Sequence, residues 1–155
     1  MIVSRESDVF VSLGANLGDR QASLDRARQE IAALRETSVE ACSRQRITKA
    51  VGPVEQPDFI NQVLRLATSL EPRELMRRLL EIENSMGRVR DVRWGPRTID
   101  IDILFFGRLR LESDLLSLPH PEVWNRPFFL RMVAEIDSTF LAHWDEYTAE
   151  TDRGK

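Results

Sequence analysis

The chain has 155 residues, of which 42% are hydrophobic, so it can fill the core of a single domain over residues 1–155. Its formal net charge of −3 provides no global basic excess for coating nucleic acid. The single cysteine excludes an intramolecular disulfide framework, and no apolar run approaches the length needed to span a membrane. The N-terminal residues lack the long apolar stretch of a signal peptide, so we expect a cytoplasmic protein that binds neither nucleic acid nor membrane.

The first half of the sequence predicts a strand, a helix and a second strand, followed by a long loop. Residues 9–13 are a short apolar run typical of a buried strand, and a glycine-rich turn follows them. Asp19 is placed to cap the helix, whose buried positions recur at helical spacing: Leu24, Ala27, Ile31 and Leu34. A weaker strand is expected over residues 39–47, and the loop covers residues 48–58.

The second half repeats this order. Residues 59–70 are typical of a longer strand, Pro72 suits the first turn of a helix, and Gly87 suits its end. Residues 99–106 form the next strand, and Pro127 begins a third helix after an irregular stretch. Residues 137–155 carry no signal beyond closing the domain or trailing into solvent. The β-α-β, β-α-β order predicts an α+β, ferredoxin-like split βαβ sandwich, with a mostly antiparallel sheet covered by helices.

Asp100 and Asp102 are the least ordinary residues of the last predicted strand. Residues i and i+2 share a face, so the two carboxylates project together while Ile99, Ile101 and Ile103 point into the core. Aspartate is a poor strand former, and two close carboxylates repel each other unless a cation lies between them. Oxygen ligands with water and phosphate in the remaining shell suit Mg²⁺, and such a pair can bridge two ions. The alternative is a polar strand face paired with nearby arginines.

Residues 87–97 form a loop in which one acidic residue, Asp91, stands among four arginines: Arg88, Arg90, Arg93 and Arg97. Guanidinium groups match phosphate oxygens bidentately, and Trp94 offers a flat face to an adenine ring or to an arginine. A cationic loop next to paired acids is typical of a phosphoryl-transfer site. The alternative is a solvated run of charges.

The segment RWGPRTIDIDIL, residues 93–104, resembles the signature of the 6-hydroxymethyl-7,8-dihydropterin pyrophosphokinase family of folate synthesis. Further segments resemble the same family in the same order: VSLGANLGDR, GPVEQPDFIN, EIENSMGRVR and LPHPEVWNRPF. The resemblance implies a ferredoxin-like fold and an ATP-dependent transfer of pyrophosphate to the hydroxymethyl group of the dihydropterin, which releases AMP. It also implies two Mg²⁺ ions, with ATP and the dihydropterin as the small-molecule partners. No obligate protein partner is evident from the sequence.

The resemblance further implies roles for individual residues. Asp100 and Asp102 would hold the metal ions, and Arg88 and Arg97 would be the catalytic arginines. The ATP contacts would be Glu83, Arg90, Trp94, Ile103, His120 and Arg126. The pterin pocket would consist of Thr48, Val51, Phe59, Asn61 and Phe128. The amide of Asn61 suits the edge of a pterin. The alternative for Phe128 is core packing beside Phe129. The alternative for His120 is an ordinary surface loop residue.

Some positions depart from the family pattern and concern affinity and loop shape rather than chemistry: Ala15, Lys49, Ala50, Leu80, Leu115 and Pro121. Two other functions remain as alternatives. One is a ferredoxin-like module that binds nucleotide or pterin without turnover. The other is a two-metal phosphohydrolase, which would need a general base beside the acids to orient water.

Overall fold

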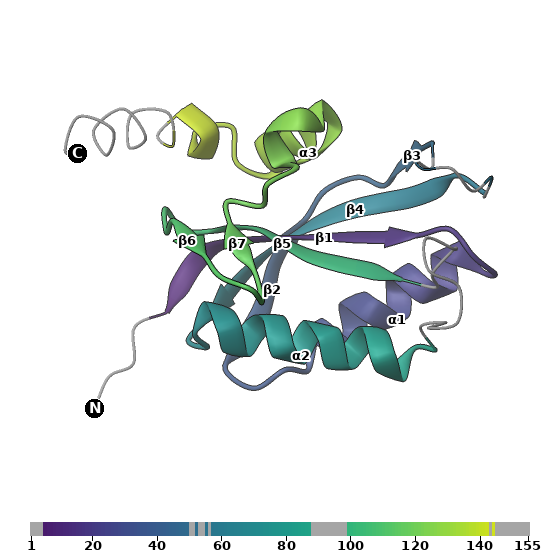
Figure 1. Ribbon diagram of the computed structural model, residues 1–155, viewed down its shortest axis with the longest axis horizontal. Coiled ribbons are helices and arrows are strands. Elements are labelled where there is room, and N and C mark those ends of the chain that lie inside the picture. Colours follow the sequence, from purple (N-terminus) through teal and green to yellow (C-terminus); the bar gives the residue numbers. More distant parts are fainter. Residues whose placement is uncertain are drawn as a thin grey trace.

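Across the residues that it describes (5–49, 52, 55, 57–87, 99–142 and 144), the computed structural model has a five-stranded antiparallel sheet (Figure 1). Strands β2 (Thr37–Cys42), β4 (Phe59–Thr68), β1 (Glu6–Ala15) and β5 (Asp100–Phe106) lie in that order, and β3 (Arg46–Thr48) also pairs with β4. Helix α1 (Arg20–Ala32) connects β1 to β2, and α2 (Pro72–Ser85) lies between β4 and β5 in the chain. The predicted ferredoxin-like α+β fold is confirmed.

The helix ends follow the local signals in the sequence. Asp19 caps α1 as predicted, because its side chain accepts the main-chain N–H of Ala22 at 3.0 Å. Pro72 is the first residue of α2, and Gly87 follows the helix with a φ of +82°, which favours glycine. Helix α3 (Pro127–Ile136) begins at the predicted proline. Leu34 lies beyond the end of α1, so it packs on the core from the following turn rather than from the helix.

Two segments differ from the sequence prediction. The strand expected over residues 39–47 is divided into β2 and β3, because Ser43 between them bonds to Val63 through both its main chain and its hydroxyl. The stretch expected to be irregular, residues 118–127, contains a 3-10 helix, η1 (Val123–Asn125). A hairpin of β6 (Leu111–Glu112) and β7 (Ser117–Leu118), for which the sequence offers no prediction, precedes it.

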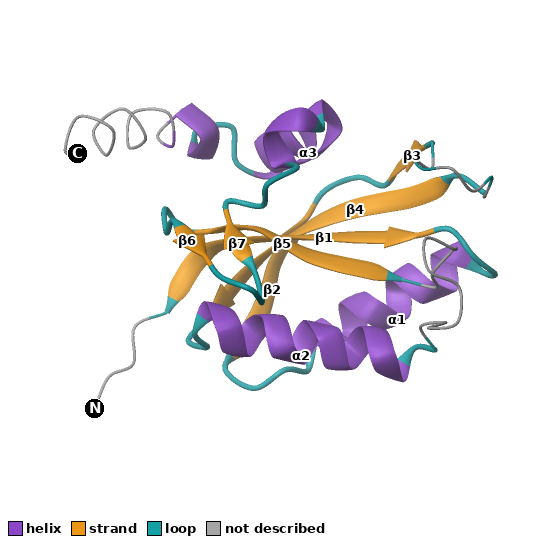
Figure 2. Ribbon diagram, in the orientation of Figure 1, coloured by secondary structure: helices purple, strands orange, loops and turns teal. Residues whose placement is uncertain are grey.

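The two faces of the sheet carry different layers. Figure 2 shows α1 and α2 on one side of the sheet and α3 on the other. The first face is apolar and packs on the two long helices through residues such as Val11, Leu13, Leu64, Ile101 and Ile103. On the second face a separate cluster covers only part of the sheet: Phe10, Val63, Leu104 and Phe105 meet Phe129, Met132 and Val133. Part of the second face therefore remains available for a ligand. None of the helices in the described part of the chain is long and apolar enough to cross a membrane.

Candidate functional site on the open face of the sheet

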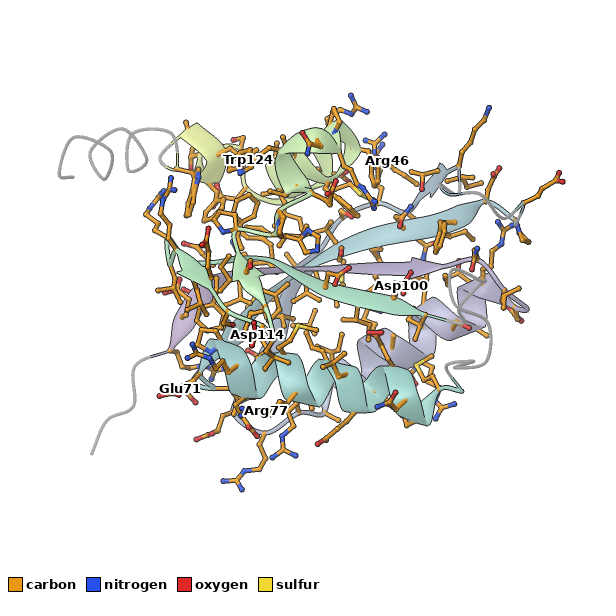
Figure 3. The ribbon with its side chains drawn as sticks, in the orientation of Figure 1. Arg46, Glu71, Arg77, Asp100, Asp114 and Trp124 are labelled. Carbon is orange, nitrogen blue, oxygen red and sulfur yellow. The ribbon has the colours of Figure 1, made fainter. Side chains whose placement is uncertain are left out.

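A band of mostly polar positions, called the polar row below, crosses β4, β1 and β5 on the face of the sheet that carries α3: Asn61, Gly14, Ser12, Asp100 and Asp102. The register pairs Asn61 with Gly14 and Gly14 with Asp100, and the next row on this face pairs Ser12 with Asp102. Directly opposed residues of neighbouring strands project to the same side of a sheet, so these positions share one face. The two aspartates therefore lie on the side opposite α1 and α2 (Figure 3, where Asp100 is labelled).

The alternation predicted for β5 is confirmed. Ile101 and Ile103 are buried against the helices, whereas the side chain of Asp102 remains 50% exposed. The apolar residues hold the strand in place, and the carboxylates between them stay accessible to ligand and water. Two oxygen donors fixed on one strand face fit a hard cation that completes its shell with water and phosphate. The described residues include no cluster of three or more histidine, cysteine, aspartate or glutamate side chains able to hold a metal ion.

His120 reaches Asp102 because of a β-bulge in β5. The register of β1 with β5 shifts between Phe10 and Val11, and Leu104 is left without a Cα partner on β1. The main-chain carbonyl of Leu104 instead accepts the N–H of His120 at 2.9 Å. The imidazole Nε2 then lies 3.9 Å from the Asp102 carboxylate. Bulges commonly redirect a side chain next to a functional site, and this one attaches a distant loop to the strand that carries the acidic pair.

The main chain also fixes the orientation of the His120 ring. Its Nδ1 accepts the N–H of Glu122 at 3.1 Å, so a neutral imidazole carries its proton on Nε2. Nε2 is also the ring atom that faces Asp102. The half-buried ring therefore presents an N–H donor to the acidic part of the site, where it suits an anionic oxygen such as that of a phosphate.

A cavity of about 260 Å³ lies beside Asp102 and His120. Its wall includes Met76 of α2 and the predicted nucleotide contact Ile103, and residues of the β6–β7 hairpin and the loop after it complete the lining: Ser113, Asp114, Leu115, Leu116, Ser117 and Pro121. The hairpin turn is closed by Ser113, whose hydroxyl donates to the Leu116 carbonyl at 2.8 Å. Asp114 and Ser117 carry no periodic signal in the sequence, because the strands of this hairpin are only two residues long.

The other predicted nucleotide and catalytic residues lie elsewhere or outside the described residues. Glu83 is buried on α2 and Arg126 is exposed before α3, and neither lines the cavity. The remaining predicted residues fall in segments outside the described residues: Arg88, Arg90, Trp94 and Arg97, together with Val51 of the predicted pterin pocket.

Three predicted pterin residues gather at the other end of the polar row. Asn61 is 6% exposed, and its amide nitrogen donates to the hydroxyl of Thr48 on β3. A Cβ on Gly14 would lie 2.8 Å from Asn61 Oδ1 and 3.3 Å from a ring carbon of Phe59. The absence of a side chain at Gly14 thus leaves room for both neighbours. The fourth described pterin candidate, Phe128, is half-buried on α3 and its ring centroid lies 4.3 Å from that of Phe129.

Glu135 connects α3 to the chain around β3, next to these residues. Its carboxylate accepts the main-chain N–H of Arg44 at 2.8 Å, and it lies 3.8 Å from the guanidinium groups of Arg44 and Arg46. Exposed ion pairs stabilise a fold little by themselves, but the charge-assisted bond to a main-chain N–H fixes the position of the helix more firmly. Arg46 is labelled in Figure 3. The sequence gives no local signal for this contact, because its partners are far apart in the chain.

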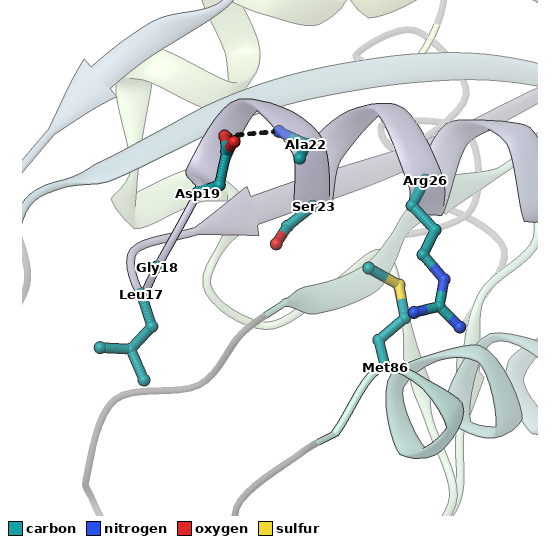
Figure 4. Close-up of a pocket in the computed structure, with 7 residues that line it drawn as sticks. All are labelled: Leu17, Gly18, Asp19, Ala22, Ser23, Arg26 and Met86. Atoms are coloured by element: carbon teal, nitrogen blue, oxygen red, sulfur yellow. Dashed lines mark hydrogen bonds between the residues drawn. The ribbon is translucent and has the colours of Figure 1, made fainter.

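A second cavity of about 360 Å³ lies at the start of α1 (Figure 4). Its lining consists of Leu17, Gly18, Asp19, Ala22, Ser23, Arg26 and Met86. The carboxylate of Asp19 is already used by the cap of the helix. No residue predicted for the metal, ATP or pterin lines this cavity, so its larger volume does not make it the better candidate.

The fold and the polar row define a ferredoxin-like α+β protein whose open sheet face carries an acidic candidate site. Residues 10–138 match the 7,8-dihydro-6-hydroxymethylpterin-pyrophosphokinase family. The chain belongs to that family, and the predicted family is confirmed.

Relatives from bacteria and plants are similar over most of the chain. A 2-amino-4-hydroxy-6-hydroxymethyldihydropteridine pyrophosphokinase of Bacillus subtilis is 40% identical over 93% of this chain and 85% of its own length. The protein of that name from Synechocystis is 44% identical over 81% of this chain and 64% of its own length. A mitochondrial folate synthesis bifunctional protein of Pisum sativum is 33% identical over 97% of this chain and 30% of its own length. The chain thus spans less than two thirds of the last two proteins.

Replacing Gly14 with alanine should displace the side chain of Asn61 from Thr48. The new Cβ would lie 2.8 Å from Asn61 Oδ1, and such overpacking costs about 1–3 kcal/mol of the free energy of unfolding. Urea denaturation measures the cost, and the side-chain amide NMR signals of Asn61 report its displacement. In an Asn61→Ala background the same change should cost less, because the clashing atom is absent. Equal costs in both backgrounds would contradict the assigned contact.

Proposed function

We propose that the protein transfers pyrophosphate from ATP to the hydroxymethyl group of 6-hydroxymethyl-7,8-dihydropterin and releases AMP, as a step of folate synthesis. The observation that carries the proposal is the polar row, which places an acidic end at Asp100 and an amide end at Asn61 on the same face of the sheet. Asp100, Asp102 and His120 suit a triphosphate and its cations. Asn61 and Phe59 suit a flat heterocycle with an amide-like edge. Membership of the family and the names of the relatives support this choice of substrates.

Asp100 and Asp102 are proposed to hold two Mg²⁺ ions together with ATP. The fit rests on oxygen donors that share a face, remain accessible and need water or phosphate to complete a six-ligand shell. When bound, the ions neutralise the negative charge of the phosphates and orient them for in-line attack. The close approach of the two carboxylates is then favourable, because the cations offset a repulsion that would otherwise oppose it.

His120 is proposed to donate its Nε2–H to a phosphate oxygen. Its main-chain bond to Leu104 and its ring bond to Glu122 hold the donor in place before the ligand arrives, which reduces the reorganisation needed during the reaction. On the strength of the sequence, Arg88 and Arg97 are proposed to meet the charge that develops on the transferred group. Arg90 and Trp94 are proposed to contact the nucleotide.

The pterin hydroxyl is proposed to attack directly, so that no protein nucleophile is needed. A bond forms between the hydroxymethyl oxygen and the β-phosphorus of ATP, and the bond from that phosphorus to the α,β-bridging oxygen breaks. The hydroxyl proton is lost, and AMP leaves with the bridging oxygen. Asn61, held by Thr48, is proposed to bind the amide-like edge of the pterin, and Phe59 and Phe128 are proposed to contact its faces. Catalysis then consists mainly of positioning and charge neutralisation.

The first test of the function is the identity of the nucleotide product. The protein is mixed with ATP, Mg²⁺ and 6-hydroxymethyl-7,8-dihydropterin, with one control that lacks pterin and one that contains EDTA. We expect AMP and pterin diphosphate in equal amounts, and only when pterin and free Mg²⁺ are both present. ADP and phosphate formed without pterin would indicate the phosphohydrolase alternative. Binding of ATP without any AMP would indicate the module without turnover.

Asp100→Asn and Asp102→Asn should each lower kcat by about a hundredfold or more, because a charge that stabilises the reacting phosphates is removed. Circular dichroism and thermal unfolding should show an intact fold, since these changes leave the buried face of β5 untouched. Asp114→Asn is the matched control, because it removes a carboxylate from the cavity that Asp102 lines, but from the hairpin rather than from β5. Near-normal turnover of either strand variant would contradict the proposed metal ligands.

A further inference from the structure

Two buried aromatic residues lie beyond the part of the chain that matches the family. The match ends at residue 138, yet Phe140 is 3% exposed and Trp144 is 2% exposed. Both belong to the cluster on the sheet face that carries α3. Burying two large rings is one of the main contributions that a short terminal segment can make to folding. The described residues of this segment, 137–142 and 144, are called the C-terminal segment below.

The C-terminal segment packs on the strand that carries the acidic pair. The ring of Phe105, near the end of β5, lies 5.2 Å from the ring of Phe140 and 5.5 Å from that of Trp144. Phe10 of β1 lies 4.7 Å from Phe140. Phe105 stands three positions after Asp102 in the sequence of β5. The C-terminal segment therefore packs on the same strand, β5, that carries the acidic pair.

Two arginines between β5 and β6 cover the same two rings. Arg108 lies over Phe140, with 5.5 Å from its guanidinium carbon to the ring centroid. Arg110 lies over Trp144 at 5.7 Å. A guanidinium over an aromatic face is attracted by the negative potential of the ring, and its flat shape adds packing area. The arginines and the aromatic rings thus pair one to one and attach the segment to the loop after β5.

The C-terminal segment also contacts η1, which lies in the chain between the candidate ATP contacts His120 and Arg126. Trp124 of η1 lies 6.4 Å from Trp144 and 5.7 Å from Phe105, ring to ring. Before η1, the carbonyl of His120 accepts the N–H of Val123 at 3.0 Å. A single turn of 3-10 helix has few hydrogen bonds to hold it, so its position depends on packing against its neighbours.

A structured turn joins the C-terminal segment to α3. The main-chain N–H of Asp137 still bonds to the Val133 carbonyl of α3 at 2.9 Å. The Asp137 carboxylate then accepts the hydroxyl of Thr139 at 2.8 Å and its main-chain N–H at 3.0 Å. These hydrogen bonds hold the pKa of Asp137 below its ordinary value. A displacement of the segment would therefore be passed on to α3.

We propose that the C-terminal segment is a positioning element for the substrate site, in which Trp144 and Phe140 hold η1 and α3 against β5. Through η1 it sets the place of His120, and through α3 it sets the place of Phe128. The roles of those two residues toward ATP and pterin rest on the proposed function. The effect of the segment on the order of η1 and α3 does not, and it is measured separately.

Hydrogen exchange of the full-length protein tests the positioning without any substrate. Trp144→Ala should make the amides of Val123, Arg126 and Phe129 exchange at least about tenfold faster than in the wild type, since local opening of η1 and the start of α3 becomes easier. Trp144→Phe keeps a ring under Arg110 and should restore slow exchange. Ile31→Ala on α1 is the matched control, because it weakens the other core cluster and should leave these three amides unchanged.

Steady-state kinetics provides the second readout. Trp144→Ala should raise KM for ATP and for the pterin about fivefold or more, with a smaller change in kcat, because ligand-contacting residues are displaced while Asp100 and Asp102 remain in place. Trp144→Phe should restore both constants. If Trp144→Ala does not fold, Arg110→Met gives the same test in milder form, because it removes the cation and keeps an apolar chain over the ring.

Three results would overturn the proposal. One is unchanged exchange at η1 and α3 in a folded Trp144→Ala protein, and if that protein does not fold, in Arg110→Met. Another is an equal effect of Ile31→Ala on the same amides, which would reduce Trp144 to a general contribution to stability. The third is normal KM values despite faster exchange. A wild-type protein that forms no AMP would instead contradict the proposed function, and the exchange result would still decide whether the segment positions η1 and α3.

Discussion

The alternation of β5 is the constraint on which the site depends. A strand must place neighbouring residues on opposite faces, so burying Ile101 and Ile103 under α1 and α2 forces Asp100 and Asp102 onto the other face. If that face were fully covered, two carboxylates would be buried together at a large energetic cost. The second helix layer covers only part of the sheet, and the side chain of Asp102 remains 50% exposed. The acidic residues of β5 therefore require that the layer formed by α3 leave part of this face uncovered.

The partial cover in turn has to be held in place. A bulge at Leu104 exposes a carbonyl that binds the loop of His120, and Glu135 attaches α3 to the β3 side. The aromatic cluster around Phe105 then joins β5, η1 and the C-terminal segment. The first and third of these contacts reach strand β5, and the Glu135 carboxylate accepts the main-chain N–H of Arg44 in the short connection before β3. Sites supported by such contacts are more precise than sites built from loops alone.

Local signals in the sequence were sufficient for the fold and for the acidic pair. The cap at Asp19, the proline at the start of α2 and the alternation of β5 each depend on a few neighbouring residues, and the structure confirms all three. The split between β2 and β3, the β6–β7 hairpin and the bulge depend on partners far along the chain, which periodicity does not reveal. Phe140 and Trp144 carried no recognisable pattern, because their burial comes from contact with β5 and η1. Resemblance to the family selected Thr48, Phe59 and Asn61, but it gave no reason for Gly14, whose missing side chain makes their arrangement possible.

An NMR titration would locate ligand binding on the protein most directly. The labelled protein would be titrated with Mg²⁺ and an ATP analogue whose α,β-bridging oxygen is replaced by a methylene group, and then with the pterin. We expect the nucleotide to shift the amides of Asp102, His120 and Ser117, and the pterin to shift those of Gly14 and Asn61, with Ala22 and Ser23 unaffected. Shifts confined to Ala22, Ser23 and their neighbours around the cavity at the start of α1 would contradict a site on the open face of the sheet.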